Sequence, residues 1–448
     1  MSAAATASLA GELRALCGAE HVVEDAAELS HMRIGAEPPA VAVTPGSADE
    51  IAAILRVANE HGQGVLPAGG CTQQTGGLRP KADILLYTTR LTEIEHYDPA
   101  DLTIGIGAGC TAARLSSKVA VDNLFFAGDP ALPERSTIGG LLATGTNGPH
   151  RHGYGGVRDY CIGIRFVTGE GRKAKGGGRV VKNVAGYDMM KLLIGSYGTL
   201  AVITSASFKL FPAPRQTRTF VADFATSAEA LKFRDIVMRS PLSPMCLEIV
   251  SPGALGQIPS SMASTGAWLI AVRASGSDAV LARYRSELGS AVTCELDGDK
   301  ETELWRAIAN FPLTDIAEHG MLKTIPPFVM WMLPVVSLHV PLAEVGDAIE
   351  RLNQLMTPNV SMTMVGRVGI GHLLVVLRAE NPELPVGFHI EIVDKLRGSL
   401  SPHASLLMRS GDHPSGFWPM TPTNAESMRV VKSVLDPRDI LNRGRFLF

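Results

Sequence analysis

The chain has 448 residues, of which 46% are hydrophobic and 19% are charged, and its 41 basic and 44 acidic residues give a net charge of −3. This length suits two or three domains with a sizeable core. The sequence holds no basic run, so nothing in it indicates nucleic-acid binding. Its six cysteines lie far apart, without metal or redox spacing such as C-x-x-C. We therefore expect a reducing compartment, no metal site and no iron–sulfur cluster on this chain.

The N-terminal residues and the most apolar window indicate no signal peptide and no membrane-spanning segment. The first residues have neither a basic start nor a continuous apolar run, so they do not resemble a signal peptide. The most apolar window, residues 325–342, contains four prolines, and Pro334 in its middle would break a spanning helix. We expect a buried strand and turn there, or a hydrophobic docking surface, and we expect the protein in the cytoplasm.

Strands and helices alternate in the first part of the chain. A helix is predicted at residues 47–62, because Ser47 and Glu50 have capping-box spacing and Gly62 suits the C-terminal end. A hairpin with a glycine-rich loop is predicted at 167–181, followed by an alternating strand at 199–212. The other predicted strands are at residues 40–45, 64–70, 82–88 and 101–109.

The sequence changes in character near residues 213–220. Two successive sets of strands and helices follow, which is typical of an α+β domain. The chain then closes with a short helix and an irregular tail. We expect a first domain at 1–214, a cap domain at 215–408 and a C-terminal segment at 409–448.

The segment "GIGAGCTAARL", residues 105–115, looks at first like a dinucleotide-binding fingerprint. It lacks the third glycine of G-x-G-x-x-G, and no acidic residue ends a strand about 20 positions later. Asp129 lies in a Gly-Asp-Pro turn instead. We therefore predict an ordinary strand–turn–helix corner here.

The segment "PAGGCTQQTGG", residues 67–77, is more informative. Gly69 and Gly70 allow consecutive amides to point in one direction, as an anion-binding nest requires. Thr72 and Gln73 add side-chain donors, and no Lys-Ser or Lys-Thr follows, so this is not a nucleoside-triphosphate loop. The alternative is a plain glycine turn.

The segment "STIGGLLATGTNGPHRHGYGGVRD", residues 136–159, supplies a second glycine cluster. Ser136 or Thr137 is suited to cap a helix that begins at Ile138, and free amides at that start would favour a phosphate oxygen. Gly139 and Gly140 would let a ligand approach the backbone. Two separate nests suit a pyrophosphate, with one anchor on each side.

A third glycine segment, residues 182–204, ends in another strand. Its turn at residues 198–200 is suited to receive an adenine edge through backbone groups. Two interpretations of its polar residues stay open: contact with the cofactor, or stapling of the loop with Asp188 as a helix cap. These polar residues are Lys182, Asn183, Tyr187 and Asp188.

Four segments, in this order along roughly residues 38–214, resemble the FAD-binding domain of the vanillyl-alcohol oxidase/p-cresol methylhydroxylase (PCMH-type) flavoproteins. They read "VTPGSADEI", "PAGGCT", "STIGGLLATGTNGPHRHGYGGVRDYCIGIRFV" and "GSYGTLAVITSASFKLFP". "RVVKNVAGYDMMKLLIGSYGTL" is similar to the FAD-binding subunits of bacterial glycolate oxidases. The resemblance implies an α+β fold with a two-subdomain FAD-binding domain, a ferredoxin-like cap and a tail that returns to the FAD domain. The tail "LDPRDILNRGRF" resembles the closing signature of the family, with Arg443 in place of a proline.

The resemblance implies FAD as the cofactor and gives each matched position a role. The first loop would hold the pyrophosphate, the second cluster would line the other side, and the third segment would lie near the adenine. The residues expected to bind FAD are Pro67, Ala68, Gly69, Gly70, Cys71, Thr72, Gln73, Ser136, Thr137, Ile138, Gly139, Gly140, Thr144, Gly148, Tyr154, Gly155, Gly198, Thr199, Leu200, Ile203 and Asn442.

The chain departs from the family at several positions. Relatives with a covalent flavin often carry histidine in the first loop, where this chain has Cys71 and Gln73, so we expect non-covalent FAD. A cysteinyl link through another cysteine stays open. Gly145 and Gly153 stand where the family usually has asparagine and arginine. The paired metal-binding histidines of catalytic relatives are not evident, and Arg367 in "VGRVGIGH" takes the place of one of them.

Oxidation of a 2-hydroxy acid requires a carboxylate clamp, a base for the hydroxyl proton and a flavin that accepts hydride. Arg367 and Arg409 are candidate clamps, because a guanidinium is planar and bidentate. His372 and His403 are candidate bases, because histidine titrates near neutral pH. The alternative for an arginine on a cap strand is a structural ion pair.

The sequence is compatible with three functions. The first is an FAD-dependent 2-hydroxy-acid dehydrogenase that passes electrons to an iron–sulfur subunit or a quinone. Its expected partners are a second FAD subunit and an iron–sulfur subunit, which would also provide peripheral attachment to the inner face of the membrane. The second is an FAD-carrying assembly or electron-transfer subunit without its own substrate site. The third, a flavin reductase of cell-wall precursor synthesis, fits the third glycine segment poorly.

Overall fold

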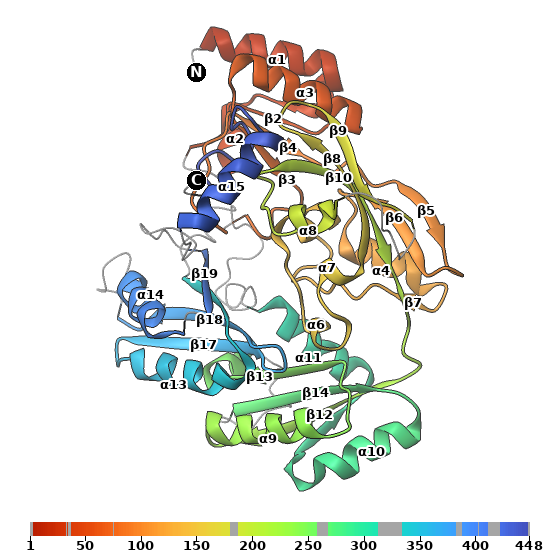
Figure 1. Ribbon diagram of the computed structural model, residues 1–448, viewed down its shortest axis with the longest axis vertical. Helices are drawn as coiled ribbons and strands as arrows, with labels where there is room; N and C mark the ends of the chain where they lie inside the picture. The colour runs from red at the N-terminus through yellow and green to blue at the C-terminus, as the bar shows by residue number, and fades with distance from the viewer. Residues whose placement is uncertain are drawn as a thin grey trace.

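The computed structural model describes residues 3–32, 34, 37–74, 76–179, 187–257, 268–311, 334–381, 388–401, 403–410 and 422–446. Within these ranges the strands form sheets of four, five, two and eight strands. Figure 1 shows two large bodies, with the elements from α1 to β10 and helix α15 in the upper one and the eight-stranded sheet with its helices in the lower one. This arrangement confirms the predicted α+β class.

The first subdomain is a small sheet covered by helices. Strands β2, β4 and β3 run parallel, and β1 pairs with β2 in the antiparallel sense. Apolar residues of α1 and α3 are buried against this sheet. Its elements are α1 (Ala3–Cys17), β1 (Val22–Val23), α2 (Ala26–His31), β2 (Val41–Val43), α3 (Ala48–His61), β3 (Val65–Ala68) and β4 (Ile84–Tyr87).

Helix α3 begins and ends where the sequence predicts. The Glu50 amide donates to the Ser47 hydroxyl at 3.1 Å, and Gly62 ends the helix with a φ of 67°. The Glu50 carboxylate reaches back to the Gly46 amide at 2.7 Å, one residue earlier than a standard capping box.

The second subdomain is an antiparallel sheet in the order β5-β6-β10-β8-β9. One face packs on a core with α4, α5, α7 and α8. A two-stranded ribbon, β7 with β11, leads toward the cap. The elements are β5 (Ile94–Asp98), β6 (Thr103–Gly107), α4 (Ala112–Ala120), β7 (Leu124–Phe125), α5 (Ile138–Thr144), α6 (Arg151–Tyr154), α7 (Val157–Tyr160), β8 (Cys161–Thr168), β9 (Lys173–Gly177), α8 (Met189–Leu193), β10 (Ala201–Lys209) and β11 (Phe211–Pro212).

The glycines of residues 105–109 serve packing, which agrees with the predicted strand–turn–helix corner. A Cβ on Gly107 would lie 2.3 Å from the Leu91 carbonyl oxygen, and one on Gly109 would lie 2.1 Å from that of Thr88. The chain then enters α4, which the Thr111 hydroxyl caps by accepting from the Arg114 amide at 3.3 Å.

The cap is one sheet built from two β-α-β-β-α-β units, the ferredoxin-like arrangement. Its order is β15-β12-β14-β13-β17-β18-β16-β19, so the two units join edge to edge through β13 and β17. The first unit contains β12 (Thr217–Phe224), α9 (Ser227–Arg239), β13 (Cys246–Val250), β14 (Trp268–Ser275), α10 (Asp278–Leu288) and β15 (Cys294–Leu296). The second contains β16 (Val335–His339), α13 (Val345–Leu355), β17 (Val360–Arg367), β18 (His372–Ala379), α14 (Phe388–Ser399) and β19 (Ser405–Ser410). This doubling explains the two sets of elements in the sequence.

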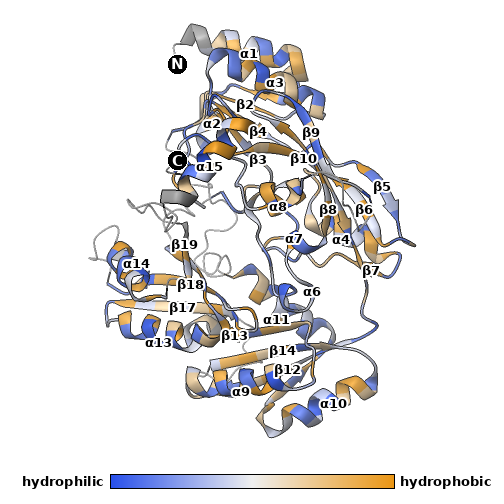
Figure 2. Ribbon diagram, viewed as in Figure 1, coloured by the Kyte–Doolittle hydropathy of each residue, from blue (hydrophilic) through white to orange (hydrophobic). Residues whose placement is uncertain are grey.

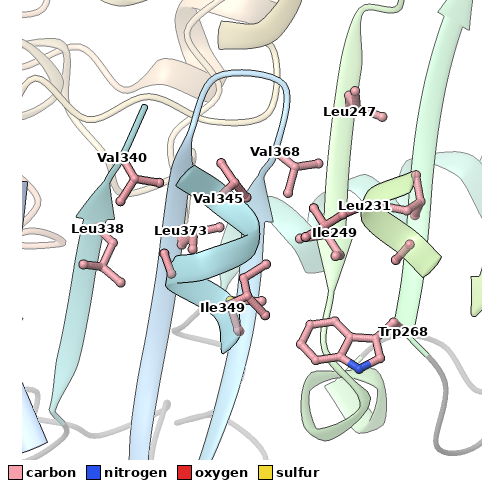
Figure 3. Close-up of a cluster of buried hydrophobic side chains, with 14 of the residues drawn as sticks. Leu231, Leu247, Ile249, Trp268, Leu338, Val340, Val345, Ile349, Val368 and Leu373 are labelled. Carbon is pink, nitrogen blue, oxygen red and sulfur yellow. The ribbon is translucent and has the colours of Figure 1, made fainter. Parts of the chain in front are cut away.

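The two faces of the cap sheet have different neighbours. Helices α9, α10, α13 and α14 cover one face with a large apolar core, and Figure 3 shows Val345 and Ile349 of α13 over Leu338 and Leu373. The other face packs on α11 (Gly298–Asn310) and on Tyr154 of the upper body. Figure 2 shows the corresponding mixture of hydrophobic and hydrophilic residues on α9 and α13. Side chains on the second face therefore look toward the FAD-binding body.

The tail returns to the first subdomain, as expected. Helix α15 (Pro422–Leu435) and the C-terminus lie beside the N-terminal elements in Figure 1. The Val65 amide donates to the Ile440 carbonyl at 2.7 Å, and the Leu78 amide donates to the Arg445 carbonyl at 2.9 Å. Strand β19 runs to Ser410, two residues past the expected domain limit at 408; the three domain limits stay predictions.

The apolar window at residues 325–342 is described only from residue 334, and the rest lies outside the described residues. Residues 335–339 form the buried strand β16, as predicted for this part. In the described ranges, no helix is both long enough and apolar enough to cross a membrane.

Candidate cofactor and substrate site

A cleft with about 630 Å³ of empty space, part of it open to solvent, lies where the three glycine segments meet. This volume is typical of a ligand pocket. Thirteen of the residues expected to bind FAD line it: Pro67, Ala68, Gly69, Gly70, Cys71, Thr72, Gln73, Thr137, Gly139, Gly140, Thr144, Gly198 and Ile203. Gln74, Thr88, Ala143, Tyr197, Ala201 and Val202 also line it and were not predicted.

The first loop offers unused backbone donors to the cleft. Among the described residues, none accepts a hydrogen bond from the amides of Gly69, Gly70, Cys71 or Thr72. The loop follows directly from β3, and Cys71 has a φ of 55°. Because these amides have no partner in the described part of the protein, the loop suits an anion-binding nest better than a plain glycine turn.

The first two glycine segments touch each other. A Cβ on Gly69 would lie 2.0 Å from Thr137 Oγ1, and a Cβ on Gly70 would lie 1.7 Å from the Arg135 carbonyl oxygen. Ser136 Oγ donates to the Ala131 carbonyl at 2.6 Å, so the Thr72 hydroxyl donates to Ser136 at 2.9 Å. A side chain does not fit at Gly70, because the Arg135 backbone lies directly against it, whereas Gly69 lies against the Thr137 side chain.

The expected anion site at the start of α5 is wrong. The Ile138 amide donates to the Cys110 carbonyl at 2.8 Å and the Gly139 amide donates to that of Ala108 at 2.7 Å. The Gly140 amide donates to Thr137 Oγ1 at 3.2 Å. The amides are not free, because α5 begins against the corner between β6 and α4. Gly139 and Gly140 still line the cleft, whereas Ser136 and Ile138 are buried behind it.

The third segment and the tail complete the cleft. Gly198 has a φ of 68° and lies beside Asn442, whose Nδ2 donates to the Tyr197 carbonyl at 2.6 Å. Asn442 is 2% exposed, and its Oδ1 has no partner among the described residues. An unpartnered buried oxygen next to the cleft calls for a donor from outside the protein.

Two predicted residues of this segment lie behind the cleft. Thr199 and Leu200 are buried, and the Thr199 carbonyl accepts from Lys432 Nζ at 2.8 Å. Lys432 also donates to the Leu441 carbonyl at 3.0 Å and pairs with Asp436 at 2.5 Å. Lys432 therefore connects α15 and the tail to the wall of the cleft through hydrogen bonds. Nothing in the sequence indicated this role.

Burial raises the pKa of the Cys71 thiol to about 11. The group is therefore a neutral thiol at physiological pH, and its Sγ lies 3.6 Å from the Gly69 carbonyl. Because the thiolate is the nucleophile, this environment does not favour a cysteinyl link to the flavin at this position.

Gly148, Tyr154 and Gly155 do not line the cleft but lie on the side that faces the cap. The Tyr154 ring packs on Phe125 at 4.8 Å and on Phe211 at 5.0 Å between ring centres. A Cβ on Gly148 would lie 2.0 Å from the Asp129 carbonyl oxygen. Their contact with FAD stays a prediction.

The departure at Gly153 has a structural reason. Its amide donates to the Met245 carbonyl of the cap at 3.0 Å, and a Cβ would lie 3.0 Å from the same oxygen. Helix α6 docks on β13 through this backbone contact, which leaves little room for the arginine of relatives. Gly145 ends α5 with a φ of 62°, a left-handed conformation that asparagine also tolerates.

A row of polar side chains crosses the cap face that looks toward the FAD-binding body. Arg367 of β17 is directly opposite His372 of β18, which is opposite His339 of β16. On the other side of Arg367, Ile249 of β13 pairs with Gly366 of β17, and this register places Glu248 of β13 opposite Arg367. Since directly opposite residues share a face, tertiary register brings these four side chains together. The sequence pattern indicated Arg367 and His372 as site residues but gave no signal for Glu248 and His339.

The hydrogen bonds of the row define the state of His372. Arg367 Nη1 lies 3.1 Å from His372 Nδ1, and His372 Nε2 lies 2.8 Å from Ser337 Oγ. Arginine only donates, so Nδ1 accepts and the ring proton sits on Nε2 toward Ser337. The parallel His339 ring lies 4.2 Å away. The geometry favours His372 as a positioning residue for Arg367 over the predicted base, because its free lone pair is occupied.

The other two catalytic candidates are not part of this row. His403 is exposed in the turn before β19. Arg409 lies near the far end of β19, whose first residue, Ser405, pairs with His339. The Arg409 side chain lies outside the described residues.

A second chain of polar side chains, most of them half-buried, joins the two bodies. His150 Nδ1 lies 3.2 Å from Asp129 Oδ2, and Arg273 Nη1 of β14 lies 3.4 Å from His150 Nε2. Arg273 Nε lies 3.3 Å from Glu301 of α11. His150 from the second glycine cluster therefore contacts the cap and is not simply a loop residue beside the cofactor.

Burial dominates the electrostatics of the interface. It raises the pKa of Glu248 to about 8, with Arg367 opposing and Asp129 adding to the shift. Burial also raises the pKa of Asp129, and among the effects that lower this pKa the charge of His150 is the largest. The pKa of His150 is lowered, and burial is the largest cause.

In the described ranges, no three His, Cys, Asp or Glu side chains lie together as a metal site; the absence of a metal stays a prediction.

Comparison with known proteins decides the family. Residues 39–175 match the FAD binding domain family, and residues 335–446 match the C-terminal domain of the FAD linked oxidases. D-lactate dehydrogenase of Archaeoglobus fulgidus is 30% identical over 426 residues, which cover 90% of each chain. The chain belongs to the FAD-linked oxidases.

Other relatives of this FAD-linked oxidase carry subunit names. Glycolate oxidase subunit GlcD of Bacillus subtilis is 25% identical over 431 residues, 91% of this chain and 88% of the relative. Glycolate oxidase subunit GlcE of Escherichia coli is 34% identical over 155 residues, 34% of this chain and 44% of the relative. The solved p-cresol methylhydroxylase shares the fold, with a TM-score of 0.74, 16% identity and coverage of 99% and 97%. The PCMH-type architecture implied by the sequence is confirmed.

FAD is the cofactor of this FAD-linked oxidase, and the cleft fits it. The free amides of the first loop suit the pyrophosphate, and the bare Gly140 and Gly198 leave space for close approach. The unpartnered Asn442 oxygen suits a donor of the cofactor. The assignment of individual residues to parts of FAD stays a prediction.

Proposed function

We propose that this FAD-linked oxidase oxidises a small 2-hydroxy acid, in a site formed by the cap row and the FAD cleft. The dehydrogenase chemistry follows from its family, and FAD supplies the two-electron oxidant when it is bound. The observation that supports this site is Arg367, a buried cation on the cap face that looks toward the FAD-binding body.

In this proposal the side chains of the cap bind and orient the substrate. Arg367 binds its carboxylate, since a guanidinium offers a planar pair of donors. His372 holds one guanidinium nitrogen at 3.1 Å and is itself held by Ser337 at 2.8 Å. This support fixes the orientation of the clamp, and the dry surroundings strengthen its attraction for an anion. His403 remains a candidate for receiving the hydroxyl proton.

We further propose that the chain works in an assembly. Its relatives include two proteins named as subunits of glycolate oxidase, which supports partner subunits for this chain. The partners would be a second FAD subunit and an iron–sulfur subunit, with the latter or a quinone as electron acceptor. Attachment to the inner face of the membrane would come through them. Co-purification of this chain alone with full dye-linked activity would contradict an obligate assembly.

The second candidate function is an FAD-carrying subunit without its own substrate site. It is favoured by the sequence, in which the paired metal-binding histidines of catalytic relatives are not evident and Arg367 takes the place of one of them. Both candidates predict a flavin spectrum for the purified protein. They differ in whether a hydroxy acid alone reduces the flavin.

Anaerobic reduction separates the two candidates. The FAD-loaded protein is mixed without oxygen with glycolate, D-lactate or 2-hydroxyglutarate, and flavin absorbance is followed. A dehydrogenase bleaches with at least one acid; no bleaching with any acid would refute the dehydrogenase and favour the carrier. Arg367→Ala should raise KM for that acid by about 10- to 100-fold, the effect of losing a charged hydrogen-bonding partner. Arg283→Ala, on the exposed face of α10, serves as the control.

A further inference from the structure

Glu248 is a buried carboxylate whose hydrogen bonds are missing. The residue is 0% exposed in the middle of β13, and neither carboxylate oxygen has a hydrogen-bond partner among the described residues. Its near cation is Arg367, with 3.8 Å between Nε and Oε1, which is too long for a hydrogen bond. Arg367 Nε likewise has no hydrogen-bond partner among the described residues. The pair is balanced in charge but not bonded, which is costly for a buried ion.

The charges around Glu248 come from several elements. Arg367 on β17 favours the ionised carboxylate, and Asp129, from the loop before α5, disfavours it. Cys246, two residues away on the same strand, has its pKa raised by burial and is neutral. Arg273 of β14 lies opposite Cys246 and is paired with Glu301. His372 of β18 accepts a hydrogen bond from Arg367 at its Nδ1. Glu248 therefore depends on Arg367 for its charge balance.

We propose that Glu248 is a positioning residue that takes up one proton from solvent when an anionic substrate binds Arg367. This inference rests on the proposed function, since it concerns the same clamp. Above about pH 8 the free protein carries the ionised carboxylate, which balances the charge of the guanidinium, and in the complex the substrate carboxylate takes over that role. Protonation of Glu248 then prevents two buried carboxylates from sharing one cation. One anion and one proton enter together, so the net charge of the site does not change.

The raised pKa of Glu248, about 8, sets the range in which this coupling is visible. Below that pH the free protein already carries the proton, and affinity for an anion is independent of pH. Above it, binding must draw the proton from solvent, so affinity falls about tenfold per pH unit. The neutral carboxyl can then donate a hydrogen bond, a role the ionised group cannot have.

Oxalate is a suitable probe, because it is an anion of similar size that the flavin does not need to oxidise. It is titrated into the FAD-loaded protein from pH 6.5 to 9.5, with the change in flavin absorbance as the signal. Proton uptake is measured at pH 9 in weakly buffered solution with an indicator dye. Wild type should lose about tenfold in affinity per unit above pH 8 and take up about one proton per oxalate. Glu248→Gln should show neither effect, and Glu287→Gln on exposed α10 should behave as wild type.

Three results would overturn the inference. They are a loss of oxalate affinity with pH in Glu248→Gln as steep as in wild type, no proton uptake by wild type, or no binding of oxalate. The wild-type uptake decides the matter even if the glutamine variant folds poorly. Failure of every hydroxy acid to bleach the flavin would refute the proposed function but not proton-coupled binding of oxalate. Bleaching combined with pH-independent oxalate affinity would refute only the inference.

Discussion

Replacing Gly70 with alanine tests whether the first two glycine segments must touch for FAD to bind. The new Cβ would lie 1.7 Å from the Arg135 carbonyl oxygen and 2.7 Å from its carbon. Both are backbone atoms, which cannot rotate away as a side chain can. The φ of Gly70 is not in the left-handed region, so the cost of this substitution is steric and not conformational.

The structure sets the size of the expected effect. The two loops would have to separate by about 1.3 Å to bring the Cβ to 3.0 Å from the oxygen. Overpacking of this kind costs about 1–3 kcal/mol. Because the cleft requires both loops in place, a cost of about 2–3 kcal/mol would weaken FAD binding by about 30- to 140-fold.

FAD affinity is measured by adding FAD to the apoprotein and following its fluorescence, with thermal melting in the presence and absence of FAD. Gly178→Ala is the matched control, since no atom lies within 4 Å of its added Cβ. The Gly70 variant should bind FAD more weakly and gain less melting temperature from it than the control. Equal affinities for the two variants would refute the reasoning that contact between the loops builds the cofactor site.

Three further predictions concern the tail, the cap and the flavin link. Lys432→Ala leaves the fully buried Asp436 carboxylate without its cation and should cost about 3–5 kcal/mol in urea unfolding, whereas exposed Ser433→Ala should stay within about 0.5 kcal/mol. Because the folded pKa of Glu248 is raised from 4.5 to about 8, the folded protein keeps this proton longer, so the free energy of unfolding should fall as pH rises from about 5 to 8. Glu248→Gln should remove that fall in urea unfolding measured across this range; an unchanged pH profile would contradict the burial argument. Acid precipitation should release FAD intact from wild type and from Cys71→Ser alike, and flavin retained in the pellet would indicate a covalent link.

Local segments were predictable from the sequence because their geometry depends on near neighbours. The helix expected at 47–62 is α3 at Ala48–His61, with the predicted residues at both ends. The strand expected at 64–70 is β3 at Val65–Ala68, and its glycines follow it into the cleft. The sequence also marked the change to a cap with two similar sets of elements, because each unit repeats the same periodicities.

Local sequence does not decide the hydrogen bonds of a backbone group that has two possible partners. Free amides were expected at the start of α5, but the carbonyls of Cys110 and Ala108 take them. Nothing in the sequence around Thr137 says that this helix begins against the turn after β6. Hydrogen-bond satisfaction of a helix end is a property of what lies beside it, not only of its capping residue.

The sequence by itself determined the FAD-binding glycine segments, the class of fold and two of the residues in the cap row. Only the tertiary structure decided which glycines line the cleft, which ones pack against backbone, and which charges meet. Glu248 lies 119 positions before Arg367 along the chain, and strand register alone puts them on one face. Register depends on pairing between distant segments, so no local pattern could reveal that a carboxylate in an apolar strand would face this arginine.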